Sequence, residues 1–238
     1  MDRTLLNLAA VLGFATGASA DDEIAKARWS LTAECQMLVV PQKLALTLIP
    51  ELLDDATFTQ AWERLQPLLA TGEVKQVAHL IVRGQAGAKL SSASVEEFRY
   101  ATEFDPVKLP EDVPKEKAVE FLKHWPLVGI TPLAFETRNI GPSLELQANV
   151  SEDGEWLTAR VNPMHVRLLR MEKIDAGVLP SGVHLSVEQP QFYTVQSVLE
   201  MHLSAGQRIL AGVHTLLGNE GLELFILRIT TQRTGAAK

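Results

Sequence analysis

The segment LELQANV at residues 144–150 alternates apolar and polar side chains along its whole length. Because successive side chains of a β-strand point to opposite faces, this alternation predicts a strand with one buried face. Residues 193–201, YTVQSVLEM, follow the same pattern. Residues 222–229, LELFILRI, are apolar on both faces in their middle, which predicts a strand inside a packed sheet or at an oligomer interface.

Turn residues separate the strands of this region. Asp153-Gly154 can adopt the positive φ angles of a tight hairpin, Ala205-Gly206-Gln207 is expected to do the same, and residues 219–221 (NEG) are expected to close the last pair. Strands joined by such short turns pair antiparallel. Residues 127–232 are therefore predicted to form an antiparallel β part, followed by a tail at 233–238.

Residues 21–104 are predicted to form a smaller β-α-α-β-β part. A strand around residues 35–40 (CQMLVV) opens it, and apolar residues at helical spacing then predict helices over 41–53 and 58–69. Asp54-Asp55 separates the helices, and Asp55 or Thr57 is the expected N-cap of the second.

A β-hairpin is expected to complete this part. Residues 74–82 alternate, Gly84-Gln85-Ala86-Gly87 is a turn sequence, and the return strand runs through residues 94–100. The predicted fold class is α+β and mainly β, with an antiparallel, hairpin-rich sheet.

Residues 105–126 form a charged link rich in proline, with Pro106, Pro110, Pro114 and Pro126 at its joints. Within it, residues 115–125 are predicted to form one short helix with an apolar side. The link is expected to pack on the body of the protein.

The first twenty residues have the layout of a signal peptide. Arg3 precedes an apolar run at residues 5–14, and Ala18-Ser19-Ala20 fits a small-residue cleavage site, so we expect cleavage after Ala20 and export. A retained amphipathic helix is the alternative, but the apolar residues come too densely to leave a polar face. No cysteine directly follows the cleavage site, and no later stretch is apolar for long enough to form a membrane helix.

Composition narrows the function further. The chain has 238 residues, 46% of them hydrophobic, and a net charge of −7, so it can bury a core and lacks the basic surface that nucleic acid requires. Cys35 is the only cysteine, which excludes an internal disulfide. We interpret it as a small hydrophobe in a strand rather than as a nucleophile.

Motifs for chemistry are not found. The histidines lack the i, i+4 spacing of a zinc site on a helix, and no phosphate-binding or nucleophile-elbow motif occurs. Residues 151–154 (SEDG) are interpreted as a hairpin turn rather than a calcium loop, and Glu96 and Glu97 face opposite sides of a strand. The sequence therefore predicts no catalytic residues, no metal and no cofactor, although an enzyme built from residues distant in sequence stays an alternative.

An ordered set of short segments resembles the secretin domain of type II and type III secretion systems and of type IV pilus machines. Residues 206–213 (GQRILAGV) resemble that family's Gly-Gln-x-hydrophobic-x-x-Gly-Gly hairpin. The other matching segments, in order, are residues 33–40, 72–78 with 84–87, 128–132, 141–146, 161–163 (VNP), 189–192 and 223–227. The resemblance covers most of the chain after residue 20 and implies a secretin-like wall fold.

Departures from the family pattern modify this expectation. The predicted signal peptide leaves only a short lead before Glu34, Gly212-Val213 stands where the family has paired glycines, and the lip segment is reduced to residues 214–221. Only 6% of the residues are aromatic, whereas a membrane barrel requires aromatic girdles. We therefore expect a shortened relative without a gated pore.

The resemblance implies a non-enzymatic exported protein in the periplasm or outer membrane. It would be a structural or assembly component that binds itself or proteins of an envelope secretion or pilus machine, with membrane association but without a transmembrane helix. The alternative is a soluble periplasmic binding or interaction module that has lost pore formation.

Two sets of residues are singled out. Glycines, one glutamine and prolines are expected to set turns, allow close backbone approach or end strands, unless they are ordinary turn residues: Gly129, Pro132, Gly141, Pro142, Pro163, Pro190, Gly206, Gln207 and Gly212. Aromatic residues could anchor an interface, with a place in the core as the alternative: Trp156, Phe192, Tyr193 and Phe225.

Overall fold

The computed structural model describes residues 29–105, 117, 120, 130–178, 184–219 and 221–234. The predicted signal peptide, Gly129 and the link helix, apart from residues 117 and 120, lie outside the described residues.

The order of the elements follows the sequence patterns, except that the single strand expected over residues 193–201 is two strands, the first ending at residue 196 and the second beginning at residue 199. In chain order they are β1 (Trp29–Val40), α2 (Gln42–Leu53), α3 (Asp55–Thr71), β2 (Lys75–Gln85), β3 (Lys89–Ala93), β4 (Glu96–Asp105), β5 (Thr131–Val150), β6 (Trp156–Val178), β7 (His184–Gln196), β8 (Leu199–Ser204), β9 (Arg208–Thr215), a short 3₁₀ helix (Leu217–Asn219) and β10 (Leu222–Arg233). The predicted fold class is confirmed: the protein is α+β, mainly β and antiparallel.

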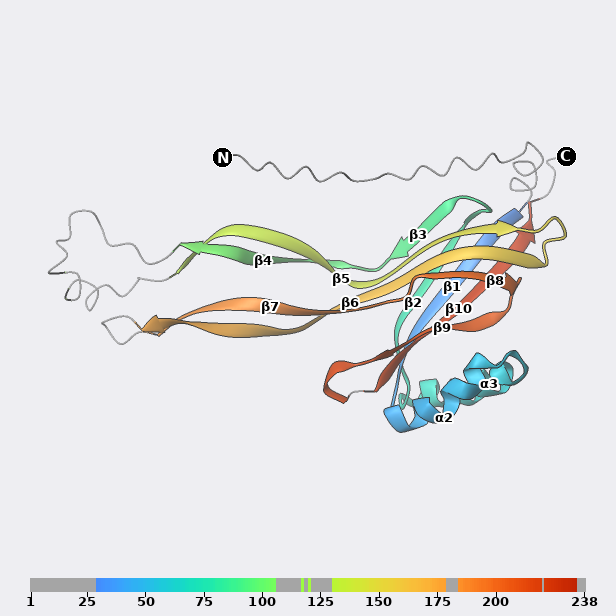
Figure 1. Cartoon of the computed structure of the whole chain (residues 1–238), viewed down its shortest axis with the longest axis horizontal. Helices are drawn as coiled ribbons and strands as arrows, with labels where there is room; N and C mark the ends of the chain where they lie inside the picture. Colours follow the sequence, from blue (N-terminus) through green and yellow to red (C-terminus); the bar gives the residue numbers. More distant parts are fainter. Residues whose placement is uncertain are drawn as a thin grey trace, which may run out of the picture.

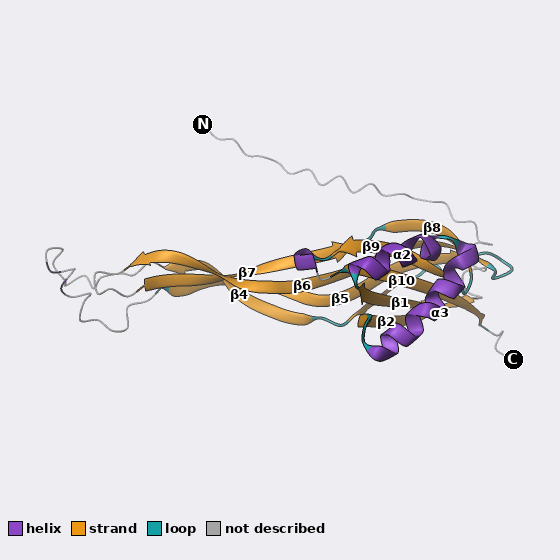
Figure 2. Cartoon of the chain, turned by 90° about the horizontal axis from the view of Figure 1, so that it is seen from below, coloured by secondary structure: helices purple, strands orange, loops and turns teal. Residues whose placement is uncertain are grey.

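The elements form three layers (Figures 1 and 2). Sheet A has the strand order β2-β1-β10-β9, and sheet B has the order β3-β5-β6-β7 with β4 also on β5 and β8 also on β6. Sheet B packs on one face of sheet A, and α2 and α3 cover part of the other face. Sheet A is therefore the middle layer.

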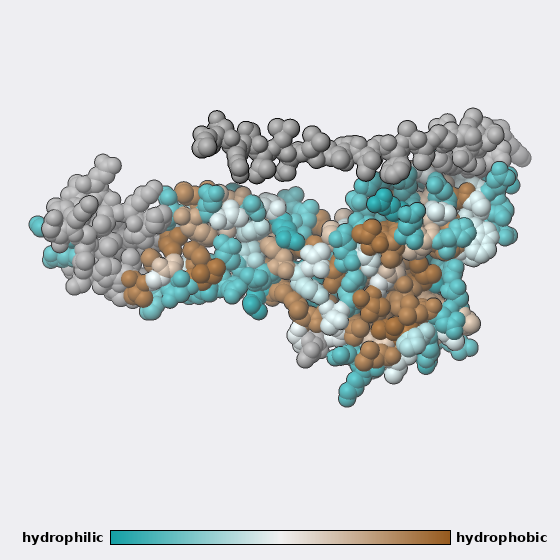
Figure 3. Space-filling view, in the orientation of Figure 1, coloured by the Kyte–Doolittle hydropathy of each residue, from teal (hydrophilic) through white to brown (hydrophobic). Residues whose placement is uncertain are grey.

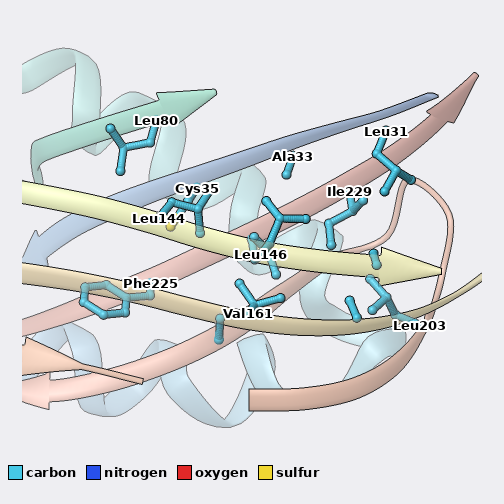
Figure 4. Close-up of a cluster of buried hydrophobic side chains, with 14 of the residues drawn as sticks. Leu31, Ala33, Cys35, Leu80, Leu144, Leu146, Val161, Leu203, Phe225 and Ile229 are labelled. Atoms are coloured by element: carbon cyan, nitrogen blue, oxygen red, sulfur yellow. The ribbon is translucent and has the colours of Figure 1, made fainter. Parts of the chain in front are cut away.

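The main core lies between the two sheets (Figure 4). The last strand, β10, is central in sheet A, and its side chains are buried on both faces, as predicted from residues 222–229. Leu224 faces the helices, whereas Phe225 and Leu227 face sheet B. Cys35 lies in the same core, where burial raises the pKa of its thiol to about 12, in agreement with a structural role.

The predicted N-caps of the second helix are wrong by one to three residues. The helix α3 begins at Asp55, and Asp54 is its N-cap, with Oδ1 accepting a hydrogen bond from the Ala56 N–H at 3.0 Å. Thr57 instead donates its hydroxyl to the Glu51 carbonyl of α2 at 2.9 Å. Asp54 thus caps α3, and Thr57 links the first turn of α3 to α2.

Two of the predicted hairpins are crossings from one sheet to the other. After residues 84–87 the chain does not return along β2, because β3 pairs with β5 of sheet B. The Ala86 N–H donates to Trp29 of sheet A, and the Gly87 N–H donates to Ala148 of sheet B. The backbone groups of this turn thus find partners in both sheets, which a hairpin would not require.

The turn at residues 205–207 also carries the chain from one sheet to the other. Its predicted hairpin is wrong because β8 pairs with β6 and β9 pairs with β10. The Ala205 N–H donates to the Glu155 carbonyl beside sheet B, and the Gly206 N–H donates to Ile229 of sheet A. The hairpins predicted at Asp153-Gly154 and at residues 219–221 are confirmed, because they join β5 to β6 and β9 to β10.

Candidate assembly surface

Strands β5 and β6 extend beyond the sandwich and form an arm (Figure 1). They have 20 and 23 residues, but the ladder between them ends at the pair Gly141 and Val166. Beyond that point residues 131–140 of β5 pair with β4, and β6 continues beside β7, with which its residues 164–178 pair; residues 164–166 thus contact both β5 and β7. The arm is thus a fork of two ribbons: ribbon 1 is β4 with residues 131–140, and ribbon 2 is β7 with residues 164–178.

The fork begins at Gly141. Its φ of +127° favours glycine, and a Cβ at this position would lie 2.3 Å from the Ser94 carbonyl oxygen between β3 and β4. At the same level β5 changes its neighbour, because Ser143 pairs with β3 and Ile140 pairs with β4. A glycine thus allows the close backbone approach at which the ribbons separate.

The expectation that four prolines end strands is wrong for Pro142, Pro163 and Pro190, which lie inside strands, whereas Pro132 is the second residue of β5. Pro142 and Pro163 accept hydrogen bonds through their carbonyls, from the N–H groups of Ser94 and Ser197. In an antiparallel strand the N–H and C=O of a residue point to the same neighbour.

The missing N–H groups of Pro142 and Pro163 therefore point to places where one neighbouring strand ends and the next begins. For Pro142 these strands are β3 and β4, and for Pro163 they are β8 and β7. Strand β7, which contains Pro190, has β6 as its ladder partner in the described chain, so that proline lies in an edge strand.

Aromatic side chains hold the two ribbons together. The Phe192 ring of ribbon 2 lies 6.0 Å from the Phe98 ring and 5.5 Å from the Tyr100 ring of ribbon 1. The Arg138 guanidinium lies 4.7 Å from the centre of the Phe192 ring and donates to the Thr194 hydroxyl at 3.3 Å. Phe192, predicted as a possible interface residue, is half-buried between the ribbons of its own chain.

The arm exposes apolar side chains on its two long strands (Figure 3). Six large ones are between 40% and 56% exposed, and all belong to β5 or β6: Leu133, Phe135, Leu169, Met171, Ile174 and Val178. Within the described residues no ladder joins β5 to β6 along these stretches or pairs the outer edges of β4 and β7. Unpaired strand edges are templates for pairing with another chain, and here apolar side chains lie beside them.

The remaining predicted aromatic residues have three different surroundings. Phe225 is completely buried in the core, so the alternative given for it, a core position, holds instead of the interface. Trp156 is 45% exposed and stacks on the His202 ring with 5.3 Å between ring centres. Tyr193 lies at the root of the arm and donates its hydroxyl to the Thr215 carbonyl at 2.6 Å.

The segment at residues 206–213, which resembles the Gly-Gln hairpin of secretins, contacts α3 and the residue after β7 in this fold. Gly206 has a φ of +83°, and Gln207 donates its side-chain amide to Asp55 of α3 at 2.8 Å. A Cβ at Gly212 would lie 2.3 Å from the Ser197 hydroxyl oxygen. Gln207 thus links the β8–β9 turn to a helix, and Gly212 allows β9 to lie close to Ser197, the residue after β7.

A polar seam, which the sequence patterns did not reveal, joins the arm root to sheet A. His165 Nδ1 lies 2.7 Å from Glu223 Oε1, and His214 Nε2 lies 3.1 Å from the Ser197 hydroxyl. Burial lowers the pKa of His214, and the nearby Glu223 carboxylate partly opposes this effect. The available signal was Glu223 itself, a lone carboxylate in the apolar run at residues 222–229.

The seam does not assemble a catalytic relay. A Ser-His-acid relay needs the carboxylate to bind the same histidine that faces the serine, but Glu223 bonds to His165 while Ser197 faces His214. Among the described residues no group of three or more His, Cys, Asp or Glu side chains could hold a metal ion. The same part of the chain contains no helix with the length and apolar character needed to cross a membrane.

No protein-family model and no curated protein matches the sequence. Several solved structures are similar in fold at low identity. The secretin InvG of the Salmonella SPI-1 type III secretion injectisome aligns with 10% identity and a TM-score of 0.37, over 88% of this chain and 64% of its own. The type II secretion system secretin GspD of E. coli K12 aligns with 8% identity and a TM-score of 0.35, over 87% of this chain and 50% of its own.

Aeromonas hydrophila ExeD aligns with 9% identity and a TM-score of 0.39, over 87% of this chain and 47% of its own. The protein thus spans less than two thirds of each of these three chains. At this identity and with TM-scores below 0.5, no activity, partner or family membership is carried over to this protein.

Proposed function

We propose that this chain is a non-enzymatic, exported, secretin-like structural component that assembles through its forked arm. Its partners would be further copies of itself or proteins of an envelope secretion or pilus machine, in the periplasm or at the outer membrane. The observation that carries the proposal is the arm itself, in which unpaired strand edges lie beside exposed apolar side chains.

The arrangement of the arm supports pairing with another chain. Each ribbon has only two strands, and an isolated two-stranded hairpin is marginally stable in water. Contacts between the ribbons cover the aromatic cluster only in part, and the six apolar side chains of β5 and β6 stay exposed. An added strand would satisfy the backbone groups of an edge and cover these side chains at the same time.

The positions of the family-like segments give a second support. The segments at residues 33–40 and 223–227 are far apart in sequence, yet they pair along β1 and β10 in the centre of sheet A, with Cys35 opposite Leu227. The segments at residues 141–146 and 161–163 lie at or next to the fork. These four segments therefore lie in the central sheet and at the origin of the arm.

The decisive experiment measures the oligomer mass and the cellular location of the protein in one preparation. The full chain is expressed with its own N-terminal segment, periplasmic, membrane and medium fractions are separated, and the purified protein is analysed by light scattering after size exclusion. We expect an oligomer from the periplasmic or membrane fraction. A double variant, L133K/I174K, places one charge on each ribbon and should reduce the oligomer to monomers.

A matched control is available on the helical layer. Leu46 and Leu53 of α2 are 60% and 66% exposed, so L46K/L53K makes the same chemical change away from the arm and should leave the oligomer intact. A wild-type monomer would contradict the assembly proposal and favour the alternative binding module. If both variants reduced the mass of the oligomer equally, the arm would not be specifically required for assembly.

A further inference from the structure

The face of sheet B that points away from sheet A is mostly polar within the sandwich. Alternate residues of its strands, such as Leu146 and Val161, are buried between the sheets, so the residues next to them point outward. The outward side chains come from β3, β5, β6 and β8: Lys89, Ser91, Glu145, Gln147, Asn149, Trp156, Thr158, Arg160, Asn162, Glu200 and His202. Both hydrophobic clusters of the described chain lie elsewhere, between the sheets and under the helices.

Trp156 is the large aromatic side chain on this outer face, and it is 45% exposed. Its ring stacks on the His202 ring with an interplanar angle of 2° and 5.3 Å between ring centres. His202 Nδ1 in turn lies 3.3 Å from the Thr158 hydroxyl oxygen. The indole is therefore exposed yet held by polar neighbours, which makes it a preorganised surface on which a ligand can stack.

A hollow of about 380 Å³ lies on the same face, further along β6. The outer-face residues that line it are joined by one from the β7–β8 connection: Lys89, Glu145, Gln147, Arg160, Asn162 and Val198. The Gln147 amide donates to the Gly87 carbonyl at 2.9 Å, and Lys89 forms a 3.1 Å ion pair with Glu145. Arg160 makes no ion pair with any other described residue, so its hydrogen-bond donors are available to a ligand.

The charges of this face balance. Lys89 and Arg160 are positive, whereas Glu145 and Glu200 are negative, and Arg160 and Glu200 are direct register partners on β6 and β8. A face of this kind favours neither an anion nor a cation. It does offer many hydrogen-bond donors and acceptors to a neutral polar molecule.

The distance between the two features sets the length of such a molecule. Trp156 and Asn162 are six residues apart on one strand, which corresponds to about 20 Å along β6. A ligand that reaches both the stacking surface and the hollow is therefore an extended chain.

We propose that the outer face of sheet B binds a neutral oligosaccharide. One sugar ring stacks on Trp156, because the C–H groups on the face of a pyranose form an apolar surface that suits an aromatic ring. The hydroxyl groups of the following sugars bind the polar side chains of the hollow, Arg160 among them. The site lies in the sandwich and not in the arm, so it is independent of the proposed assembly.

Two other classes of ligand fit this face less well. The core of a protein interface is depleted of charged residues and contains apolar anchors, whereas this face offers mainly Trp156 and Val198. Nucleic acid requires clustered Lys and Arg without compensating carboxylates, which the balance of charges does not provide.

The test is isothermal titration calorimetry of the full chain with three neutral tetrasaccharides: chitotetraose, cellotetraose and maltotetraose. We expect at least one to bind with a Kd of about 1 mM or tighter. A preference for chitotetraose would assign the site to N-acetylated glycans, and a preference for either of the others would assign it to unsubstituted glucans. The anionic tetragalacturonate should bind more weakly, because Glu145 and Glu200 repel its carboxylates.

Matched variants identify the residues responsible. Trp156→Ala should weaken binding about tenfold, whereas Phe135→Ala, which removes an aromatic ring of similar exposure (47%) from the arm, should leave it unchanged. Arg160→Ala should also weaken binding about tenfold. Its control is Arg170→Ala, which removes an exposed arginine from the arm part of the same strand.

Three outcomes would overturn the proposal: no binding of any neutral tetrasaccharide, equal affinities in Trp156→Ala and Phe135→Ala, or tightest binding of tetragalacturonate. Circular dichroism shows whether each variant is folded. If Trp156→Ala does not fold, the comparison of Arg160→Ala with Arg170→Ala decides. Because the site belongs to a single chain, a monomer that binds the sugar supports this proposal while contradicting the assembly, and an oligomer that does not bind it has the reverse meaning.

Discussion

Gly141 shows how one residue determines the geometry of the arm. Its φ is +127°, and the Ser94 carbonyl oxygen occupies the space where a Cβ would be. Gly177 in ribbon 2 has a similar φ of +111°, but nothing lies within 4 Å of its Cβ position. Substitutions at these two positions therefore distinguish the free-energy cost of an unfavourable backbone conformation, present at both, from the cost of a steric clash, present only at Gly141.

Substitution of these glycines should have unequal effects. Gly177→Ala forces an L-residue into an unfavourable conformation and should lower the free energy of unfolding by about 1–2 kcal/mol. Gly141→Ala adds a clash with backbone and should cost on the order of 3 kcal/mol or more. Urea denaturation followed by circular dichroism measures both, and equal costs would show that the approach of Ser94 does not restrict position 141.

His214 makes a prediction about pH at the same scale. Because burial lowers its pKa in the folded protein, the unfolded chain binds more protons below about pH 6.5, and the free energy of unfolding should fall on acidification. His214→Gln removes this titration and should show a smaller decrease between about pH 7 and pH 5 in urea denaturation. An unchanged pH dependence in the variant would contradict the role assigned to His214.

At the scale of elements, strands β5 and β6 show how one edge of a strand can serve two neighbours in turn. Along one edge, β5 pairs with β3 in the sandwich and with β4 in the arm, and β6 pairs with β8 and then with β7. Pro142 and Pro163 lie at these exchanges. Proline in a central strand removes a ladder hydrogen bond, but at these positions the neighbouring strand is itself interrupted. The prolines thus mark a change of partner within the strand.

The helix α3 provides a test of local capping. Asp54 Oδ1 accepts a hydrogen bond from the Ala56 N–H, so Asp54→Ala should lower the free energy of unfolding by about 1 kcal/mol. Asp54→Asn retains a capping oxygen and serves as the control, with an effect of only a few tenths of a kcal/mol expected. Thermal denaturation of both variants decides, and equal losses would exclude the cap as the cause.

At the scale of the whole molecule, the two turns at residues 84–87 and 205–207 build the sandwich. Each carries the chain from one sheet to the other, and in each the amide hydrogen bonds are shared between the sheets. The two turns join the sheets around the core. Cys35 of β1 points into this core, toward sheet B. Access to this thiol therefore requires the sheets to separate.

Cys35 can report on that separation. Burial raises its pKa to about 12, so at about pH 8 the folded protein should react slowly with a thiol reagent, since the thiolate is the reactive form. The labelling rate should rise with urea in parallel with loss of the circular dichroism signal. Rapid labelling without denaturant would contradict the closed sandwich, and Cys35→Ser provides the blank for the assay.

Local patterns in the sequence were enough to predict the strands at residues 144–150 and 222–229, the two helices and two of the hairpins, because periodicity and turn chemistry depend on neighbours in the chain. The sequence also indicated Phe192 and Tyr193, which lie in and at the root of the arm. For Phe225 the sequence left a core place and an interface place open, and only the fold shows that its ring is buried.

Only the tertiary structure decided which strands pair, where the chain changes sheets and how the arm forks, because these depend on partners that are distant in sequence. The seam is the clearest case: His165 and Glu223 are 58 residues apart, and neither has a role until sheet B lies on sheet A. A carboxylate becomes a buried charge only when the fold removes water from around it, and no local pattern contains that information.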